Sequence, residues 1–207
     1  MQTLKSSLEQ GLEQLGIALN ATQIQQLLDY GALLKKWNKT YNLTSKDSLE
    51  DILRLHILDS LTALPYLQGR HIADIGTGGG TPGIPLAIAA PQYQFVLLDS
   101  SSKKTRFVRQ AILELGLSHA GVITSQAENF EYAGGFNTVI SRAFASIPDF
   151  IDKTRHLLKY GGLWLAMKGR DPQAELAHLS FPWRIDALHV PGLAAERHMV
   201  SIRNSTH

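Results

Sequence analysis

The chain has 207 residues, of which 44% are hydrophobic and 18% charged, so it is long and apolar enough to bury a full core. A formal net charge of +2 at pH 7 neither requires nor opposes a nucleic-acid partner. The absence of cysteine excludes disulfides, iron–sulfur clusters and thiolate zinc sites. The first residues show no apolar signal segment, and no apolar run approaches a membrane span. We therefore expect a cytoplasmic protein without membrane contact.

Residues 1–67 carry apolar side chains at helical spacing. Ile24 and Leu27 belong to one such stripe, and residues 48–64 repeat the pattern after a polar break at 38–47. This pattern predicts an N-terminal helical extension over residues 1–67 that packs on the rest of the chain.

From residue 71 onward, short apolar runs alternate with helical patterns, which is typical of a parallel sheet with crossover helices. Strands are expected at 71–75, 95–99, 121–124, 136–143 and 161–169, with helices at 82–90, 102–116 and 147–162. No helix separates 183–190 from 197–203, so this pair predicts a closing hairpin. The order indicates an α/β, Rossmann-like domain over residues 68–207, a mostly parallel sheet flanked by helices, with ligands beyond the carboxyl ends of its strands.

A glycine-rich turn follows the first expected strand. Asp74, Gly76, Gly78 and Gly80 form the pattern D-x-G-x-G-x-G, and glycine permits positive φ and close approach of a ligand to the main chain. Thr81 is expected to cap the helix that follows. The third glycine comes two residues after the second, whereas the dinucleotide fingerprint places it three residues after. The spacing therefore argues against NAD.

Two carboxylates flank this turn. Asp74 suits a cationic amino group better than a pyrophosphate, and Asp99 ends the second strand, where it can accept hydrogen bonds from both ribose hydroxyls. Together they outline an adenosyl site for S-adenosylmethionine. The alternative is that the glycines only form a tight turn and that Asp99 is a solvated strand end.

Seven segments resemble one known family, in order, between about residues 30 and 203. They are "KWNKTYNLT", "HILDSL", "DIGTGGGTPGIPLAI", "LLDSSSKKTRFV", "ISRAFAS", "MKG" and "ERHMVSI". The chain resembles the bacterial 16S ribosomal RNA guanine-N7 methyltransferase family, also called glucose-inhibited division protein B. The resemblance implies transfer of a methyl group from S-adenosylmethionine to N7 of a guanine in the 530 loop of 16S rRNA. It also implies cofactor contacts at Gly76, Thr81, Ala127, Glu128 and Arg142.

The sequence departs from the family pattern at two places. The loop reads "GGGTPG" where relatives usually carry a bulkier apolar residue before the proline, so we expect Thr81 to contact the cofactor through its backbone. Leu55 stands where a basic residue usually precedes the histidine of "HILDS", and Arg54 comes one place earlier. On an α-helix that shift is a rotation of about 100°, which turns the arginine to another face.

Guanine N7 carries a lone pair and no proton, so its attack on a methyl sulfonium needs no general base. Catalysis then consists of positioning, and we expect no catalytic histidine or cysteine. Arg142 is the first candidate for a positioning residue, because it leaves the strand next to the expected cofactor cleft. The alternative is that it pairs with Glu128 or with the methionine carboxylate. A cation that addresses O6 alone would leave N7 free.

Basic and aromatic residues supply candidate RNA contacts. The candidates are Lys103, Lys104, Arg106, Lys168 and Arg197. Lys103, Arg106 and Arg109 line one side of a helix, which fits a phosphate-binding stripe or equally a solvated helix face. Phe144 either stacks on a base or belongs to the core, and Trp37 and Tyr41 are expected to pack against the sheet domain rather than on RNA.

No metal site is expected. His56 and Asp59 share a helix face at i and i+3 but lack a third ligand, and His198 beside Arg197 is equally isolated. The expected partner is 16S rRNA or the small ribosomal subunit, and the expected state is a monomer. Two rival functions stay open: methylation of a protein or small molecule, and an RNA-binding module that holds S-adenosylmethionine without turnover.

Overall fold

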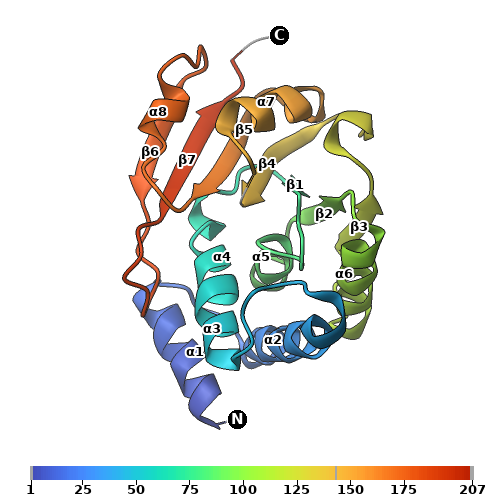
Figure 1. Ribbon diagram of the computed structural model, residues 1–207, viewed down its shortest axis with the longest axis vertical. Helices are drawn as coiled ribbons and strands as arrows, with labels where there is room; N and C mark the ends of the chain where they lie inside the picture. Colours follow the sequence, from blue (N-terminus) through green and yellow to red (C-terminus); the bar gives the residue numbers. More distant parts are fainter. Residues whose placement is uncertain (1, 143, 206–207) are drawn as a thin grey trace.

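The computed structural model describes residues 2–142 and 144–205. A seven-stranded sheet in the order β3-β2-β1-β4-β5-β7-β6 runs through the molecule (Figure 1). The strands are β1 His71–Ile75, β2 Gln94–Asp99, β3 Ala120–Thr124, β4 Phe136–Arg142, β5 Leu158–Lys168, β6 Trp183–Ala187 and β7 His198–Arg203.

The first five strands are parallel, and β7 runs antiparallel between β5 and β6. All five expected parallel strands are present, although β5 begins at Leu158 instead of residue 161, and residue 143 at the end of one expected strand lies outside the described residues. The expected terminal hairpin is confirmed as the β6–β7 pair. Strand order reverses between β1 and β4, which is the point where ligands bind in such sheets. The fold is therefore the expected Rossmann-like one.

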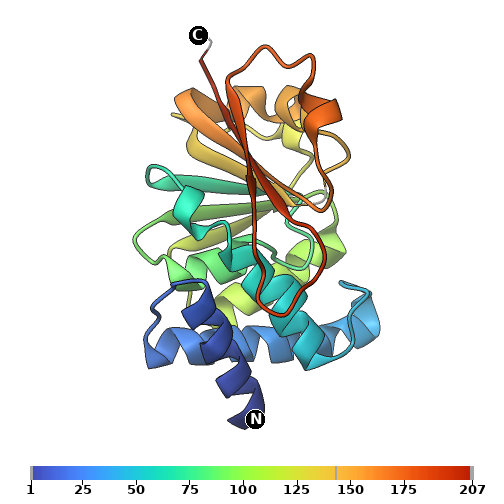
Figure 2. The same cartoon turned by 90° about the vertical axis from the view of Figure 1, so that its left-hand side faces the viewer.

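The helices lie in two layers on either side of the sheet (Figure 2). They are α1 Gln2–Gln14, α2 Ala21–Tyr41, α3 Leu49–Ile52, α4 Asp59–Leu61, α5 Gly83–Ala89, α6 Ser102–Glu114, α7 Ile147–Thr154 and α8 Gln173–Leu176. Between α3 and α4 the chain forms a π-helical turn, Leu53–Leu58, called the π-turn below. Single turns of 3₁₀-helix span Leu64–Tyr66, Ala127–Asn129 and Arg155–Leu157.

Neighbouring residues of β1 contribute to two separate hydrophobic cores, because successive side chains point to opposite faces of a sheet. Ile72 packs with Leu27, Ile57 and Phe107 on one face, where the N-terminal helices, α5 and α6 lie. Ala73 belongs to the other core, under α7. The N-terminal helices thus share a core with the sheet, while the division of the chain at residue 67 stays a prediction.

Three expected boundaries are wrong. The helix expected at 147–162 ends at Thr154, because the chain from Leu158 onward pairs with β4 as strand β5. Helix α2 continues through Tyr41 into the expected break. The helix expected at 48–64 is interrupted by the π-turn.

Among the described residues, no helix combines the length and the apolar character needed to cross a membrane. The same part of the chain contains no cluster of three or more histidine, aspartate or glutamate side chains that could hold a metal ion.

Candidate functional site

The glycine-rich turn leaves β1 with its backbone held against β2. The amides of Gly76 and Thr77 donate to the Leu98 carbonyl at 2.8 and 2.9 Å. Gly76, Gly78 and Gly80 have φ of 72°, 59° and 89°, the left-handed region that favours glycine. A Cβ on Gly76 would meet nothing within 4 Å, so its main chain faces open space.

Asp74 lies beneath the turn and is completely buried. Its Oδ2 accepts hydrogen bonds from the Thr77 hydroxyl at 2.6 Å and from the Gly83 amide at 2.9 Å. Burial raises the pKa of Asp74 to about 6, although both hydrogen bonds oppose the shift. The visible role of this carboxylate is to tie the turn to the start of α5. Its expected contact with a cofactor amino group stays a prediction.

The expected N-cap role of Thr81 is wrong. Helix α5 begins at Gly83, and Pro82, which occupies the N-cap position, makes no side-chain cap hydrogen bond. The Thr81–Pro82 peptide is cis. The Thr81 hydroxyl instead accepts a hydrogen bond from Arg142. Asp74 takes over the cap function by accepting from the Gly83 amide.

A cavity of about 380 Å³ opens at the carboxyl ends of the parallel strands. Its lining includes Gly76, Asp99, Ala127, Glu128 and Phe144. Four of these are residues predicted from the sequence to contact the cofactor, and Phe144 borders the cavity while packing on Phe150 at 5.4 Å between ring centroids. The packing of Phe144 against the core is confirmed, and its stacking on a base stays a prediction.

Asp99 shapes the cavity and keeps room for a ligand. Its Oδ2 accepts from the Gly78 amide and its Oδ1 from the Ser101 amide, both at 2.9 Å, and Lys104 Nζ lies 3.7 Å from Oδ2. Each carboxylate oxygen can accept a further hydrogen bond. An acceptor beside open glycine backbone fits the ribose hydroxyls of an adenosyl group.

A second cluster of polar side chains centres on Arg142, at the end of β4. In an α-helix the amide of Asp59 would donate to the carbonyl of Leu55, four residues earlier. Here it donates instead to the carbonyls of Arg54 and His56, so the Leu55 carbonyl is released from this hydrogen bond. Arg142 Nη1 donates to that released carbonyl at 2.9 Å. The π-turn thus creates the acceptor that holds the guanidinium, in keeping with the frequent occurrence of π-bulges at functional sites.

Asp59 joins two arginines that are distant in sequence. Its Oδ2 lies 3.0 Å from Arg142 Nη1 and its Oδ1 lies 2.9 Å from Arg197 Nε. Arg142 does pair with a protein carboxylate, as the alternative expected, but the partner is Asp59 and not Glu128, which instead faces Lys153 at 3.8 Å. Arg197 is likewise a half-buried partner of Asp59 rather than a surface arginine.

His56 completes this cluster in its neutral form. Its Nδ1 lies 3.0 Å from Arg142 Nη2, and its Nε2 lies 2.6 Å from the Thr44 hydroxyl oxygen. A guanidinium only donates, so Nδ1 accepts and the ring proton sits on Nε2, which donates to Thr44. Burial, with the charges of Arg142 and Lys46, lowers the pKa of His56 to about 4. His56 is therefore neutral at physiological pH, and its ring connects Arg142 to Thr44 through hydrogen bonds.

The other candidate RNA contacts differ in how they are held. Lys168 pairs with Glu175 at 2.7 Å and is therefore not a solvated surface lysine. Lys103 lies over the Tyr41 ring at 5.6 Å, and Arg106 is exposed on the same helix. Arg109 is exposed one turn further along α6.

The aromatic pair Trp37 and Tyr41 packs as expected. The two rings stack at 5.1 Å between centroids, and Trp37 also contacts Phe107 of α6 at 5.6 Å. The packing of Trp37 against the sheet domain is confirmed. Arg54, whose face was in question, donates to the Gly192 carbonyl at 3.1 Å.

The sequence interpretation missed Tyr30 and Thr44. The fully buried Tyr30 hydroxyl donates to the Gly79 carbonyl at 2.6 Å, so helix α2 holds the glycine-rich turn. A tyrosine inside an apolar helical stripe was a usable signal, because a buried phenol needs an acceptor. Thr44 gave no comparable signal, since its contact depends on how the loop after α2 folds back to His56.

Comparisons with known proteins agree with this geometry. A family model described as rRNA small subunit methyltransferase G matches residues 23–200. The ribosomal RNA small subunit methyltransferase G of Laribacter hongkongensis is 46% identical over 202 residues, covering 96% of this chain and 98% of that protein. The protein of the same name from Nitrosococcus oceani is 48% identical, covering 95% of this chain and 93% of its own length.

Solved structures share the fold at low sequence identity. A SAM dependent methyltransferase from Aquifex aeolicus superposes with a TM-score of 0.59 at 13% identity, covering 83% of this chain and 98% of that one. A cofactor-bound protein from MTB gives 0.61 at 16% identity, covering 87% and 90%. The chain therefore belongs to the rRNA small subunit methyltransferase G family, and it is an S-adenosylmethionine-dependent methyltransferase with a Rossmann-like, class I fold.

Proposed function

We propose that the protein transfers the methyl group of S-adenosylmethionine to N7 of one guanine in the 530 loop of 16S rRNA. Family membership supports the reaction class. Within the structure, the observation that carries the proposal is the open main chain of Gly76 beside the Asp99 carboxylate, in a cavity at the point where strand order reverses.

The residues around the cavity would hold the cofactor as follows. Asp99 accepts from the ribose hydroxyls, and the main chains of Gly76 and Gly78 lie along the adenosyl group. Ala127 and Glu128 border the adenine end, on the 3₁₀ turn after β3. Asp74, Thr81 and Arg142 lie toward the methionine end, beneath and beyond the glycine-rich turn.

When bound, the cofactor supplies an electrophilic methyl group, and the protein's own residues orient the two reactants. N7 needs no general base, so alignment of the base with the methyl group accounts for catalysis. Arg142 is the proposed positioning residue. Four hydrogen-bond partners restrict the orientation of its guanidinium: Leu55, Asp59, His56 and Thr81. A group held in this way is suited to positioning a reactant.

Lys103, Lys104 and Arg106 are proposed to hold the RNA backbone along α6. Lys168 and Arg197 are proposed as contacts near the base, through the donors that their ion pairs leave free. Replacing Lys103 and Arg106 with alanine should weaken RNA binding for all sequences alike and lower the slope of log K against log salt by about 2, one for each lost phosphate contact. An unchanged slope would assign both residues to a solvated helix face.

The decisive experiment incubates the protein with methyl-labelled S-adenosylmethionine and either naked 16S rRNA or assembled small subunits. Label on a guanine of the 530 loop, absent when that position carries 7-deazaguanine, supports the proposal. Label on protein or on small molecules only would support the first rival function. Tight cofactor binding without transfer would support an RNA-binding module. We propose that the protein acts as a cytoplasmic monomer, and light scattering at assay concentration tests the monomer.

A further inference from the structure

Side-chain hydrogen bonds fix the loop that joins α2 to α3. Asn38 Oδ1 accepts from the Thr44 amide at 2.8 Å, and Asn38 Nδ2 donates to Asp47 Oδ1 at 3.1 Å and to the Lys46 carbonyl at 3.4 Å. The Thr44 hydroxyl accepts from the Lys46 amide at 3.1 Å. The backbone of Lys46 is therefore held on both sides before any ligand arrives.

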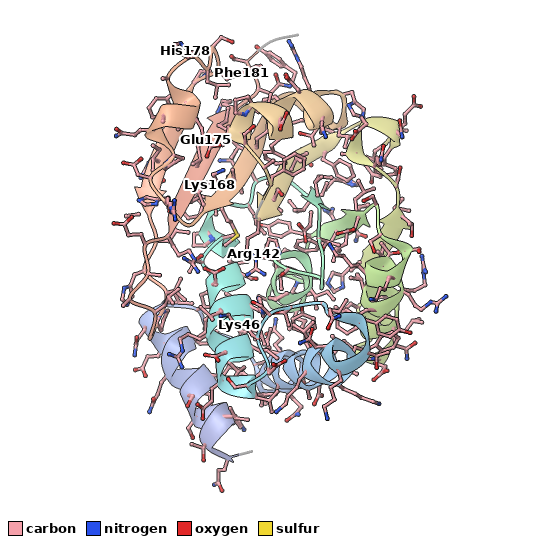
Figure 3. All side chains as sticks on the ribbon, viewed as in Figure 1. Lys46, Arg142, Lys168, Glu175, His178 and Phe181 are labelled. Carbon is pink, nitrogen blue, oxygen red and sulfur yellow. The ribbon has the colours of Figure 1, made fainter. Side chains whose placement is uncertain are left out.

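The same loop is tied to the Arg142 cluster. The Thr44 hydroxyl that accepts from the Lys46 amide also accepts from His56, whose ring accepts from Arg142. In the view of Figure 3, Arg142 lies between Lys168 above it and Lys46 below it. Lys46 thus lies in a loop that hydrogen bonds link through His56 to Arg142, the residue proposed to position the guanine.

Lys46 differs from Arg142, Arg197 and Lys168 in that its ammonium has no ion pair among the described residues. Arg142 and Arg197 share Asp59, and Lys168 pairs with Glu175. Within residues 2–142 and 144–205, the Lys46 ammonium has no ion pair and no hydrogen-bond acceptor, although the residue is half-buried. An ammonium without an acceptor in the described part of the chain keeps its donors available for a ligand oxygen.

We propose that Lys46 recognises the target guanine by donating a hydrogen bond to its O6. The inference rests on the proposed function and names a residue that determines base specificity. A compact ammonium can donate to O6 alone and leave the N7 lone pair free, whereas the planar fork of an arginine is matched to O6 and N7 together. Adenine presents an amino group in place of O6, so the ammonium disfavours it.

The first test compares K46M and K46R with K39M, which removes the same charge from the exposed last turn of α2. K46M should lower kcat/KM for 16S rRNA by about 10-fold or more, the range of one good base contact, while K39M changes it little and the affinity for S-adenosylmethionine stays constant. K46R should keep RNA affinity but fail to restore the rate. Equal losses in K46M and K39M, or full rescue by K46R, would overturn the proposal in favour of a phosphate contact.

The second test replaces the target guanine with 2-aminopurine, which keeps N7 and lacks O6, in a ligated 16S rRNA. Loss of O6 should slow the wild-type protein and should cost K46M much less, so the two changes are strongly non-additive. Additive effects would contradict the O6 contact. The wild-type protein with guanine serves as reference: absence of transfer there would refute the proposed function, whereas an active wild type with an equally active K46M would refute only this inference.

Discussion

Asp59 and Arg142 form a half-buried ion pair that fastens the π-turn to the end of β4. The two side chains are 3% and 20% exposed, and 3.0 Å separates Oδ2 from Nη1. Asp59→Asn would leave two guanidinium groups without their common counter-ion. The free energy of unfolding should fall by about 3 kcal/mol, the low end for breaking a buried pair, because both arginines keep some solvent contact.

Urea unfolding measures this loss, and the exposed pair of Glu128 and Lys153 supplies the control. Those side chains are 44% and 46% exposed and 3.8 Å apart, so Glu128→Gln should change the unfolding free energy by less than about 1 kcal/mol. Similar small values for both variants would show that Asp59 contributes no more than a surface carboxylate.

Substitutions at Gly76 in the turn and at Gly83 at the start of α5 should distinguish an effect on cofactor binding from an effect on stability. Gly83→Ala would place a Cβ 2.7 Å from Asp74 Oδ2 and 2.8 Å from Leu97, so we expect a clear loss of stability from overpacking, about 1 to 3 kcal/mol. Gly76→Ala meets no protein atom within 4 Å, and its cost to the fold is the backbone strain of about 1–2 kcal/mol at φ of 72°.

The distinguishing readout for the two glycine variants is cofactor affinity. A methyl group at Gly76 occupies the space assigned to the adenosyl group, so G76A should lose S-adenosylmethionine binding in calorimetry at a temperature where it is fully folded. If G76A bound the cofactor like the wild type, the cofactor would not lie along this main chain.

Tyr30 connects the N-terminal helices to the cofactor turn. Tyr30→Phe keeps the ring packing and leaves the buried Gly79 carbonyl without its donor, which costs about 1–3 kcal/mol. We expect lower stability in urea and a weaker affinity for S-adenosylmethionine, because the turn loses an anchor. Tyr66→Phe, at a half-buried position away from the turn, serves as control and should leave cofactor affinity unchanged.

The elements that the sequence predicted best are those set by local pattern. β1 matches its expected bounds, since a short run that contains two isoleucines stands directly before a glycine turn. The cavity gathers Gly76, Asp99, Ala127 and Glu128 because parallel strands end at one edge of the sheet. These placements follow from periodicity and topology together.

The features that escaped depend on contacts between distant segments. In the π-turn, the Leu55 carbonyl accepts a hydrogen bond from Arg142, a residue more than eighty positions later in the chain. The partners of Arg142 and Arg197 were unpredictable for the same reason, because nothing near either arginine in sequence identifies Asp59 as the common counter-ion. Pattern locates an arginine at a strand end, and tertiary packing decides what it binds.

Two buried groups should give the stability of the protein opposing pH dependences. The pKa of His56 falls from 6.5 to about 4 on folding, so between these values the unfolded chain binds the extra proton, and stability is lost as pH falls from 6.5 toward 4. The pKa of Asp74 rises from 3.8 to about 6, so the folded chain binds the extra proton, and its contribution is lost as pH rises through 6. Between pH 4.5 and 6 the two slopes partly cancel in the wild type.

Urea unfolding across pH 4.5–7 should therefore show that H56Q loses less stability on acidification than the wild type and that D74N loses more. Parallel curves for all three proteins would mean that neither group titrates differently in the folded state, and a steeper acid loss in H56Q would reverse the assigned sign.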